Sequence, residues 1–170
     1  MELIPSFQVD HTKLTPGIYV SRIDRIDQSF ITTFDVRMKI PNREPVIHPN
    51  AMHTIEHIVA TYLRNDKVCK DKIIYWGPMG CLTGCYLIMK GRPQPREIAP
   101  LLIEAFKFCR DYNEEIPGVS PVCCGNYLLH DLNMAKYEAG LYVKILEERP
   151  CFEYPVADKP EKEGVLFFDS

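Results

Sequence analysis

The chain of 170 residues lacks the features that would assign it to several special classes of protein. No apolar run approaches the roughly 20 residues of a membrane-spanning helix. The first residues also lack the basic and apolar regions of a signal peptide. Because the net charge is only −3, no excess of positive charge favours nucleic acid or an anionic membrane. We therefore expect a cytoplasmic protein that binds neither nucleic acid nor membrane.

The sequence also lacks a CxxC half-site, although it contains seven cysteines. Cys123 and Cys124 are adjacent, which argues against a Cys-rich structural zinc fold. In a reducing compartment cysteines are rarely paired. We therefore expect most of these thiols to be buried as small apolar groups and a few to bind metal or take part in catalysis.

The pattern of apolar residues predicts a mixed α+β fold. Alternation predicts strands over residues 18–25, 30–40, 72–76 and 85–90, and helical periodicity predicts helices over 51–64, 96–112 and 132–148, with Asn50 and Asp131 as N-caps of the first and the last. These elements suit an antiparallel sheet of about four strands with helices packed on one face. Residues 1–148 are expected to form a single catalytic domain, and residues 149–170 a C-terminal extension without a predicted role.

One predicted strand carries charged residues on alternate positions. Phe34, Val36 and Met38 point to one side, and Asp35, Arg37 and Lys39 point to the other. Antiparallel sheets often face water on one side. The alternation alone therefore predicts that the charged row is solvated.

The most informative stretch is His53-Thr-Ile-Glu-His57, within the first predicted helix. Residues four apart lie on the same face of a helix, so both imidazoles can bind one metal ion. Glu56 is close enough to that face to reach a bound water or substrate. H-x-x-E-H is the arrangement of the inverzincins. The alternative is a polar helix face that carries two histidines by chance.

The two faces of this helix differ in polarity. His53, Glu56, His57 and Arg64 lie opposite a broad apolar arc, which contains Ala51, Met52, Ile55, Ile58, Val59, Tyr62 and Leu63. The apolar arc should pack against the sheet, so the candidate metal site should face away from the core. A loop, the N-terminal arm or a second subunit must then cover it.

A catalytic metal site usually needs a third protein ligand. Besides carboxylates, the candidates are Cys123, Cys124, His48 and His130, and spacing alone does not choose among them. Cys81 is a separate candidate because it lies in a Gly-flanked loop between two predicted strands. A thiol near a cation has a lowered pKa and can act as an acid or base.

Several short motifs together resemble those of the S-ribosylhomocysteine lyases. They are His53-Thr-Ile-Glu-His57, Gly77-Pro-Met-Gly-Cys81 with Thr83-Gly84, Cys124-Gly125 followed by Leu129-His-Asp-Leu132, Ser6-Phe-Gln-Val-Asp-His11, and Phe34-Asp-Val-Arg37. Their order and approximate spacing agree with that family from about residue 4 to residue 147. One departure is Tyr75, where many family members carry an acidic residue.

The resemblance implies a role for each matching residue. His53, His57 and Cys124 correspond to the metal ligands, and Glu56 and Cys81 to the two general acid/base groups. Ser6, His11 and Arg37 correspond to positions near the substrate.

The resemblance also implies a cofactor and an assembly. The family metal is Fe²⁺, often replaced by Zn²⁺ or Co²⁺, with one ion per subunit. The family enzyme is a homodimer with its active sites at the interface between the subunits.

The implied reaction moves a ribose carbonyl along the sugar and then expels homocysteine by β-elimination, leaving 4,5-dihydroxy-2,3-pentanedione, the autoinducer-2 precursor. Each step passes through an enediolate, whose negative oxygen a divalent cation can stabilise. The alternatives are an inverzincin-type metallopeptidase and an inactive dimer scaffold stabilised by metal. In the peptidase Glu56 would activate water on zinc, and the Cys81 loop would have no role. The presence of both Glu56 and Cys81 argues against the inactive scaffold.

Overall fold

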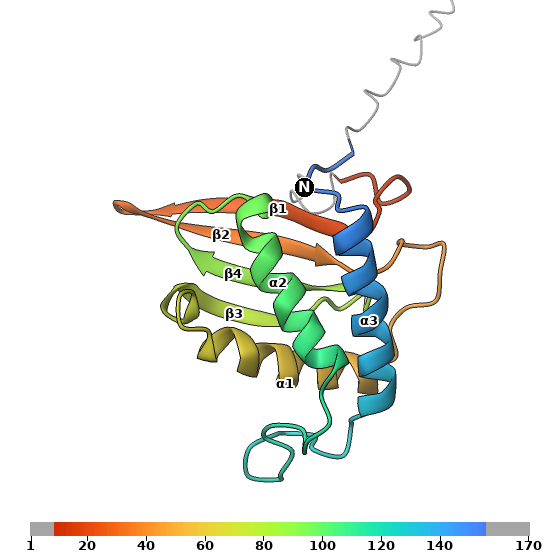
Figure 1. The fold of residues 1–170 in the computed structure, drawn as a ribbon. Helices are drawn as coiled ribbons and strands as arrows, with labels where there is room; N and C mark the ends of the chain where they lie inside the picture. The colour runs from red at the N-terminus through yellow and green to blue at the C-terminus, as the bar shows by residue number, and fades with distance from the viewer. Residues whose placement is uncertain (1–8, 156–170) are drawn as a thin grey trace, which may run out of the picture.

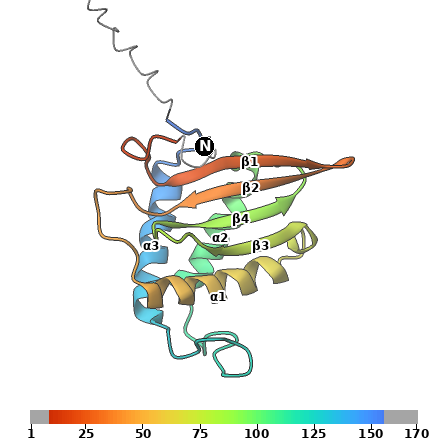
Figure 2. The same cartoon turned by 180° about the vertical axis from the view of Figure 1, so that it is seen from behind.

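The computed structural model describes residues 9–155. Its sheet contains four antiparallel strands, β1 (Gly17–Ile26), β2 (Ser29–Arg37), β3 (Ile73–Pro78) and β4 (Gly84–Lys90), in the order β1-β2-β4-β3. Three helices accompany the sheet, α1 (Pro49–Asn65), α2 (Pro95–Arg110) and α3 (Leu132–Glu148), and a short 3-10 helix, η2, spans Lys70–Lys72. Helices α2 and α3 lie across one face, whereas α1 lies along the β3 edge (Figures 1 and 2). The expected α+β architecture is confirmed.

The core lies between the sheet and the helices, where the alternating strand residues meet the apolar helix faces. Phe34 and Leu87 of the sheet and Phe106 of α2 are fully buried. The ring of Phe106 packs edge-on against Trp76, at 5.9 Å between centroids, and against Tyr142 of α3, at 4.8 Å. One aromatic side chain thus joins the sheet and two helices.

The structure confirms one of the two predicted helix N-caps and corrects the other. Asp131 accepts a hydrogen bond from the backbone N–H of Met134, which confirms it as the N-cap of α3. The expected cap of α1 was wrong by two residues, because His48 occupies that position and Pro49 begins the helix. Proline is favoured in the first helical turn, where its missing N–H costs nothing.

The prediction that Asp35, Arg37 and Lys39 form a solvated row is wrong. Asp35 and Arg37 are each 3% exposed and form an ion pair of 2.6 Å. Lys39, which follows the end of β2, pairs with Glu138 of α3 at 2.6 Å. Alternation reports only that the two sides of the strand differ, and here the polar side is covered and paired instead of solvated.

No helix within residues 9–155 is both long enough and apolar enough to cross a membrane. Ser6 and residues 156–170, including the apolar stretch 165–168, lie outside the described residues.

Replacing Phe106 with Ala should destabilise the protein by about 3–5 kcal/mol, because the substitution leaves a cavity between the sheet and two helices. Phe108→Ala is the matched control, since this ring is 39% exposed and should cost far less. Urea unfolding followed by tryptophan fluorescence measures both. Equal losses for the two variants would contradict the central position of Phe106.

Candidate metal centre and acid–base site

The two histidines of α1 lie on its polar face, as the periodicity predicted. Met52, Ile55 and Val59 are buried against the core, while His53 and His57 are half-buried beneath the chain that joins α2 to α3. His53 Nδ1 bonds the carbonyl oxygen of Leu129 at 2.8 Å, and His57 Nδ1 bonds that of Pro117 at 2.7 Å. Of the three expected kinds of cover, a loop of the same chain is therefore present.

These carbonyl contacts fix the tautomer of both imidazoles. A carbonyl oxygen only accepts hydrogen bonds, so Nδ1 of His53 and of His57 must carry the proton. Each Nε2 then keeps its lone pair free for a metal ion. A backbone carbonyl behind a metal-binding histidine is the usual means of orienting the ring and raising its basicity.

Cys124 completes a group of donors around the two histidines. Its Sγ lies 3.4 Å from His53 Nε2, and ligand atoms of His53, His57, Cys124 and His130 all lie within 4.8 Å of one another. The loop holds this thiol in place through a bond from the Cys124 backbone N–H to the Ser120 carbonyl, at 2.9 Å. Two imidazoles and a thiolate suit first-row transition metals such as Fe²⁺, Co²⁺ and Zn²⁺. The side chains present therefore fit a divalent metal ion.

The structure separates Cys124 from the other candidates for a third ligand. The neighbouring Cys123 is exposed and lies outside the donor group. His48 caps α1 through its side chain. Of the residues that spacing left open, Cys124 and His130 are brought to the two histidines.

His130 differs from the other two imidazoles in its orientation. Its ring stacks on His53, with centroids 4.2 Å apart and planes only 19° apart, whereas His53 and His57 meet at 86°. An imidazole nitrogen donates its lone pair in the ring plane, so two stacked rings aim at points in separate parallel planes. His130 therefore supports the ring of His53, and Cys124 is the better third donor.

Hydrogen bonds also define the state of His130. The Thr54 hydroxyl donates to the Asn50 carbonyl and accepts from the Asp131 backbone N–H, so at 3.1 Å His130 Nδ1 must be the donor to Thr54 Oγ1. Among the described residues, the buried Nε2 of His130 has no hydrogen-bond partner. Burial first, and then the Coulombic interactions with the neighbouring His53 and His57, lower the pKa of His130 to about 4, so the ring is neutral at physiological pH.

Glu56 faces the same cleft as the metal donors. The cleft has a volume of about 450 Å³ and is lined by Pro49, Met52, His53, Glu56, Pro78, Leu82, Cys124, Gly125, Asn126 and Leu129. Pro78 ends β3, and Leu82 belongs to the loop between β3 and β4. The carboxylate, the donor group and this loop therefore enclose one space that a small polar molecule could enter.

Cys81 lies in that loop, next to a residue with unusual backbone geometry. Leu82 has a φ of 57°, in the left-handed region that non-glycine residues rarely adopt. Its carbonyl accepts the backbone N–H of Ile47 at 3.0 Å, and its own N–H bonds the Met79 carbonyl at 2.9 Å. Backbone strain of this kind persists only where surrounding contacts hold it, and it is common at functional sites.

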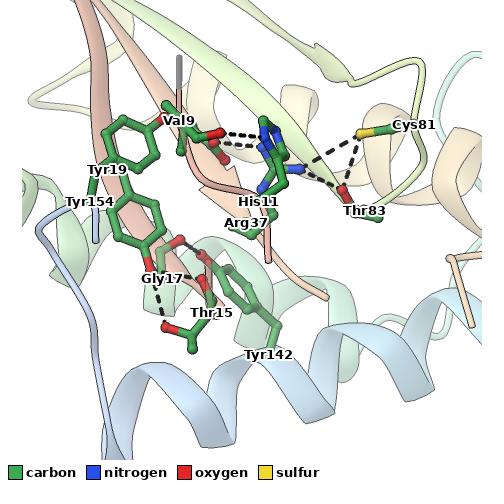
Figure 3. Close-up of polar contacts among 11 residues, drawn as sticks. Val9, His11, Thr15, Gly17, Tyr19, Arg37, Cys81, Thr83, Tyr142 and Tyr154 are labelled. Atoms are coloured by element: carbon green, nitrogen blue, oxygen red, sulfur yellow. Dashed lines mark hydrogen bonds and ion pairs between the residues drawn. The ribbon is translucent and has the colours of Figure 1, made fainter. Parts of the chain in front are cut away.

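The Cys81 thiol is held by Arg37 and Thr83 (Figure 3). Arg37 Nη1 lies 3.6 Å from Cys81 Sγ and donates to Thr83 Oγ1 at 2.5 Å. Because Thr83 Oγ1 accepts that bond, its own proton is available to Cys81 Sγ, 3.1 Å away. Burial raises the pKa of Cys81, but the Thr83 hydrogen bonds and the charge of Arg37 together lower it below the usual value.

The hydrogen bonds and ion pairs of the described residues do not join all the predicted site residues into one network. His11 Nδ1 bonds the Val9 carbonyl at 2.8 Å, and no hydrogen bond or ion pair within residues 9–155 joins it to Arg37 or Cys81. Within the same range, none joins Arg37 or Cys81 to the metal donors either. Ser6 is not described. The chain thus carries two separate clusters, one of metal donors and one around the thiol.

Sequence reasoning missed some residues that hold these clusters. Asp35 pairs with Arg37, yet the alternation placed it in water. Thr83 occurred in one of the motifs but was given no role, although it bonds the Cys81 thiol. Thr54 was also missed; it holds His130 from the buried side of α1. The one available signal was the position of Asp35, two residues from Arg37 on the same face of β2.

Replacing Cys124 with Ala should weaken Zn²⁺ binding by more than about 100-fold, since loss of a ligand exceeds the 10- to 100-fold cost of losing an outer-shell partner. Cys123→Ala is the matched control and should bind Zn²⁺ as the unaltered protein does. Competition with a chromophoric chelator measures both affinities. A larger loss in Cys123→Ala would contradict the assignment of the third ligand.

Replacing Thr83 with Val should raise the pKa of Cys81, because a hydrogen bond to the thiolate is lost. The lowered pKa keeps more thiolate near neutral pH, so alkylation of Cys81 in the unaltered protein should persist to lower pH than in the variant. The measurement is the pH dependence of iodoacetamide labelling at Cys81. Thr83→Ser retains the hydroxyl and should restore the profile; a profile unchanged in Thr83→Val would refute the role of this bond.

Comparison with known proteins agrees with the geometry of the site. The family model described as S-Ribosylhomocysteinase (LuxS) matches residues 4–150. An S-ribosylhomocysteine lyase of Phocaeicola vulgatus is 56% identical over 148 residues, covering 86% of this chain and 92% of that protein. One from Porphyromonas gingivalis is 58% identical over 144 residues (85% and 91%), and one from Borreliella afzelii 51% over 146 (86% and 93%). The chain therefore belongs to the S-ribosylhomocysteinase family, as its motifs predicted.

Proposed function

We propose that this protein is a metal-dependent lyase that cleaves S-ribosylhomocysteine to homocysteine and 4,5-dihydroxy-2,3-pentanedione, the autoinducer-2 precursor. The observation that carries the proposal is the convergence of His53, His57 and Cys124 beside Glu56, in a chain that matches the family over residues 4–150. Residues 1–148 form the catalytic domain. The enzyme acts in the cytoplasm, where the thiols at residues 9–155, all of them unpaired, stay reduced.

The metal ion is Fe²⁺, replaceable by Zn²⁺ or Co²⁺, and one ion is held per subunit by His53 Nε2, His57 Nε2 and Cys124 Sγ. When bound, it supplies a Lewis acid that stabilises negative charge on a sugar oxygen. The Leu129 and Pro117 carbonyls keep both imidazoles in the tautomer that can bind it.

Glu56 and Cys81 move protons at the sugar carbons. Migration of a carbonyl requires a proton to be taken from one carbon and returned to the next, and the β-elimination requires a further proton abstraction. The Cys81 thiolate, stabilised by Arg37 and Thr83, acts as one acid/base group. The Glu56 carboxylate, which faces the cleft, acts as the other.

The substrate is bound by Ser6, His11 and Arg37. Arg37 keeps its charge in a buried position because Asp35 pairs with it, and its Nη1 faces Thr83 and Cys81. A fixed cation beside the thiolate is suited to orienting polar groups of the sugar.

The protein works as a homodimer whose active sites lie at the interface. The sheet face opposite α2 and α3 is covered by no helix among the described residues (Figure 2). The strand register places the exposed Tyr75 and the half-buried Tyr86 and Ile88 on that face. These apolar side chains, next to the paired Asp35 and Arg37 of β2 on the same face, are suited to contact with a second subunit. Among residues 9–155, no hydrogen bond or ion pair joins the thiol cluster to the metal donors, which agrees with a site built from two subunits.

The alternatives have no comparable support. An inverzincin-type metallopeptidase takes a carboxylate as its third ligand, whereas a thiol completes the donor group here. An inactive scaffold stabilised by metal would not need a thiol with a lowered pKa beside a buried arginine.

Replacing Glu56 with Gln or Cys81 with Ala should reduce homocysteine release by at least about 100-fold, because acid–base groups contribute roughly 10²- to 10⁴-fold. Release from S-ribosylhomocysteine by anaerobic, Fe²⁺-loaded protein is followed with a thiol reagent. Glu104→Gln, an exposed carboxylate on α2, is the matched control. Near-normal release by either site variant with metal bound would overturn the assigned mechanism.

A further inference from the structure

The chain beyond α3 turns back onto the sheet instead of leaving the domain. The carbonyl of Cys151 accepts the backbone N–H of Ile18 at 2.9 Å, next to the start of β1. Three residues later the ring of Tyr154 stacks on Tyr19, with centroids 4.7 Å apart and planes 8° apart. The family match ends at residue 150, so this segment is outside what the family model describes.

A continuous chain of hydrogen bonds runs from this segment to the Cys81 thiol (Figure 3). The Tyr154 hydroxyl donates to Asp35 Oδ2 at 2.9 Å, and Arg37 Nη2 donates to the same oxygen at 2.6 Å. Arg37 Nη1 then bonds Thr83 Oγ1 and Cys81 Sγ.

We propose that Tyr154 is a positioning residue of the thiol site: its hydroxyl anchors Asp35, which in turn holds Arg37 against Cys81. The role of Cys81 as an acid/base group rests on the proposed function, but the anchoring itself does not. The segment after α3 thereby becomes part of the site's support.

Burial makes Asp35 sensitive to the loss of one partner. Its side chain is 4% exposed, and among the described residues its other oxygen, Oδ1, has no hydrogen-bond partner. Tyr154 and Arg37 are therefore the donors that stabilise the carboxylate. Without the tyrosine hydroxyl, the negative charge of Asp35 is less compensated, and the carboxylate is free to turn away from Arg37.

The effect on Cys81 is transmitted through Arg37, which bonds both Asp35 and the thiol. A displaced Arg37 no longer stabilises the thiolate. Among the described residues, Arg37 of β2 and Thr83 of the loop bond the thiol, Tyr86 of β4 interacts with it electrostatically, and Asp35 of β2 acts on Arg37. Of these, only Asp35 is bonded to Tyr154.

The test is the pH dependence of alkylation at Cys81 in Tyr154→Phe, with peptide mass spectrometry to locate the label. The midpoint should rise by about half a pH unit, which is a roughly threefold fall in thiolate at pH values below the midpoint. Tyr19→Phe is the matched control: it keeps the ring stack and removes a hydroxyl bonded to the Thr15 carbonyl, so its midpoint should not move. Labelling of the exposed Cys123 is the internal reference.

An unchanged midpoint in Tyr154→Phe, or equal shifts in the two phenylalanine variants, would overturn the proposal. A double-mutant cycle adds a second criterion: in an Asp35→Asn background, most of the effect of Tyr154→Phe should disappear. An effect that persisted undiminished would show that Tyr154 does not act through Asp35. Alkylation of Cys81 does not require catalytic turnover, so its pH dependence can be measured even in a protein that shows no lyase activity. A failure of the proposed function is therefore distinguishable from a failure of this proposal.

Discussion

The backbone carbonyls of Pro117 and Leu129 set the orientation of the metal donors, and the rest of the site depends on them. Helix α1 alone would leave two imidazoles free to rotate and to bind through either nitrogen. The chain between α2 and α3 supplies both carbonyls and also carries Cys124. The loop that covers the polar face therefore supplies the third donor as well, and both tasks require the same short segment to stay close to α1.

The thiol cluster depends on a different interaction, the compensation of a buried charge. An arginine buried at the end of β2 is expensive unless an opposite charge compensates it. Asp35 on the same face of the strand supplies that charge, Tyr154 donates to its Oδ2, and Thr83 accepts a hydrogen bond from Arg37 Nη1. This arrangement holds the buried positive charge of Arg37 beside the exposed thiol of Cys81, and burial of the cation makes its effect on the thiol stronger than that of a fully solvated charge.

The fold and the two histidine donors could be predicted from local sequence, because both arise from short periodic patterns. The helical spacing of His53 and His57 and the alternation of β2 are visible in one stretch of chain. The burial of Asp35 and Arg37 was not predictable in this way, since their contacts include residues distant in sequence, such as Tyr154, more than a hundred residues from Asp35. Cys124 could be chosen over Cys123 only through the family resemblance, because loop geometry decides which of two adjacent thiols faces the histidines.

The loop between β3 and β4 connects the two clusters, although no hydrogen bond joins them among residues 9–155. Pro78 and Leu82 line the metal cleft, whereas Cys81 between them contacts Arg37 and Thr83. Neighbouring residues can face different surroundings here because Leu82 adopts the left-handed conformation, which reverses the local direction of the chain. Contacts from Ile47 and Met79 hold that conformation. The strain at Leu82 thus has a structural purpose: it places a thiol and a wall of the metal cleft on one short, rigid loop.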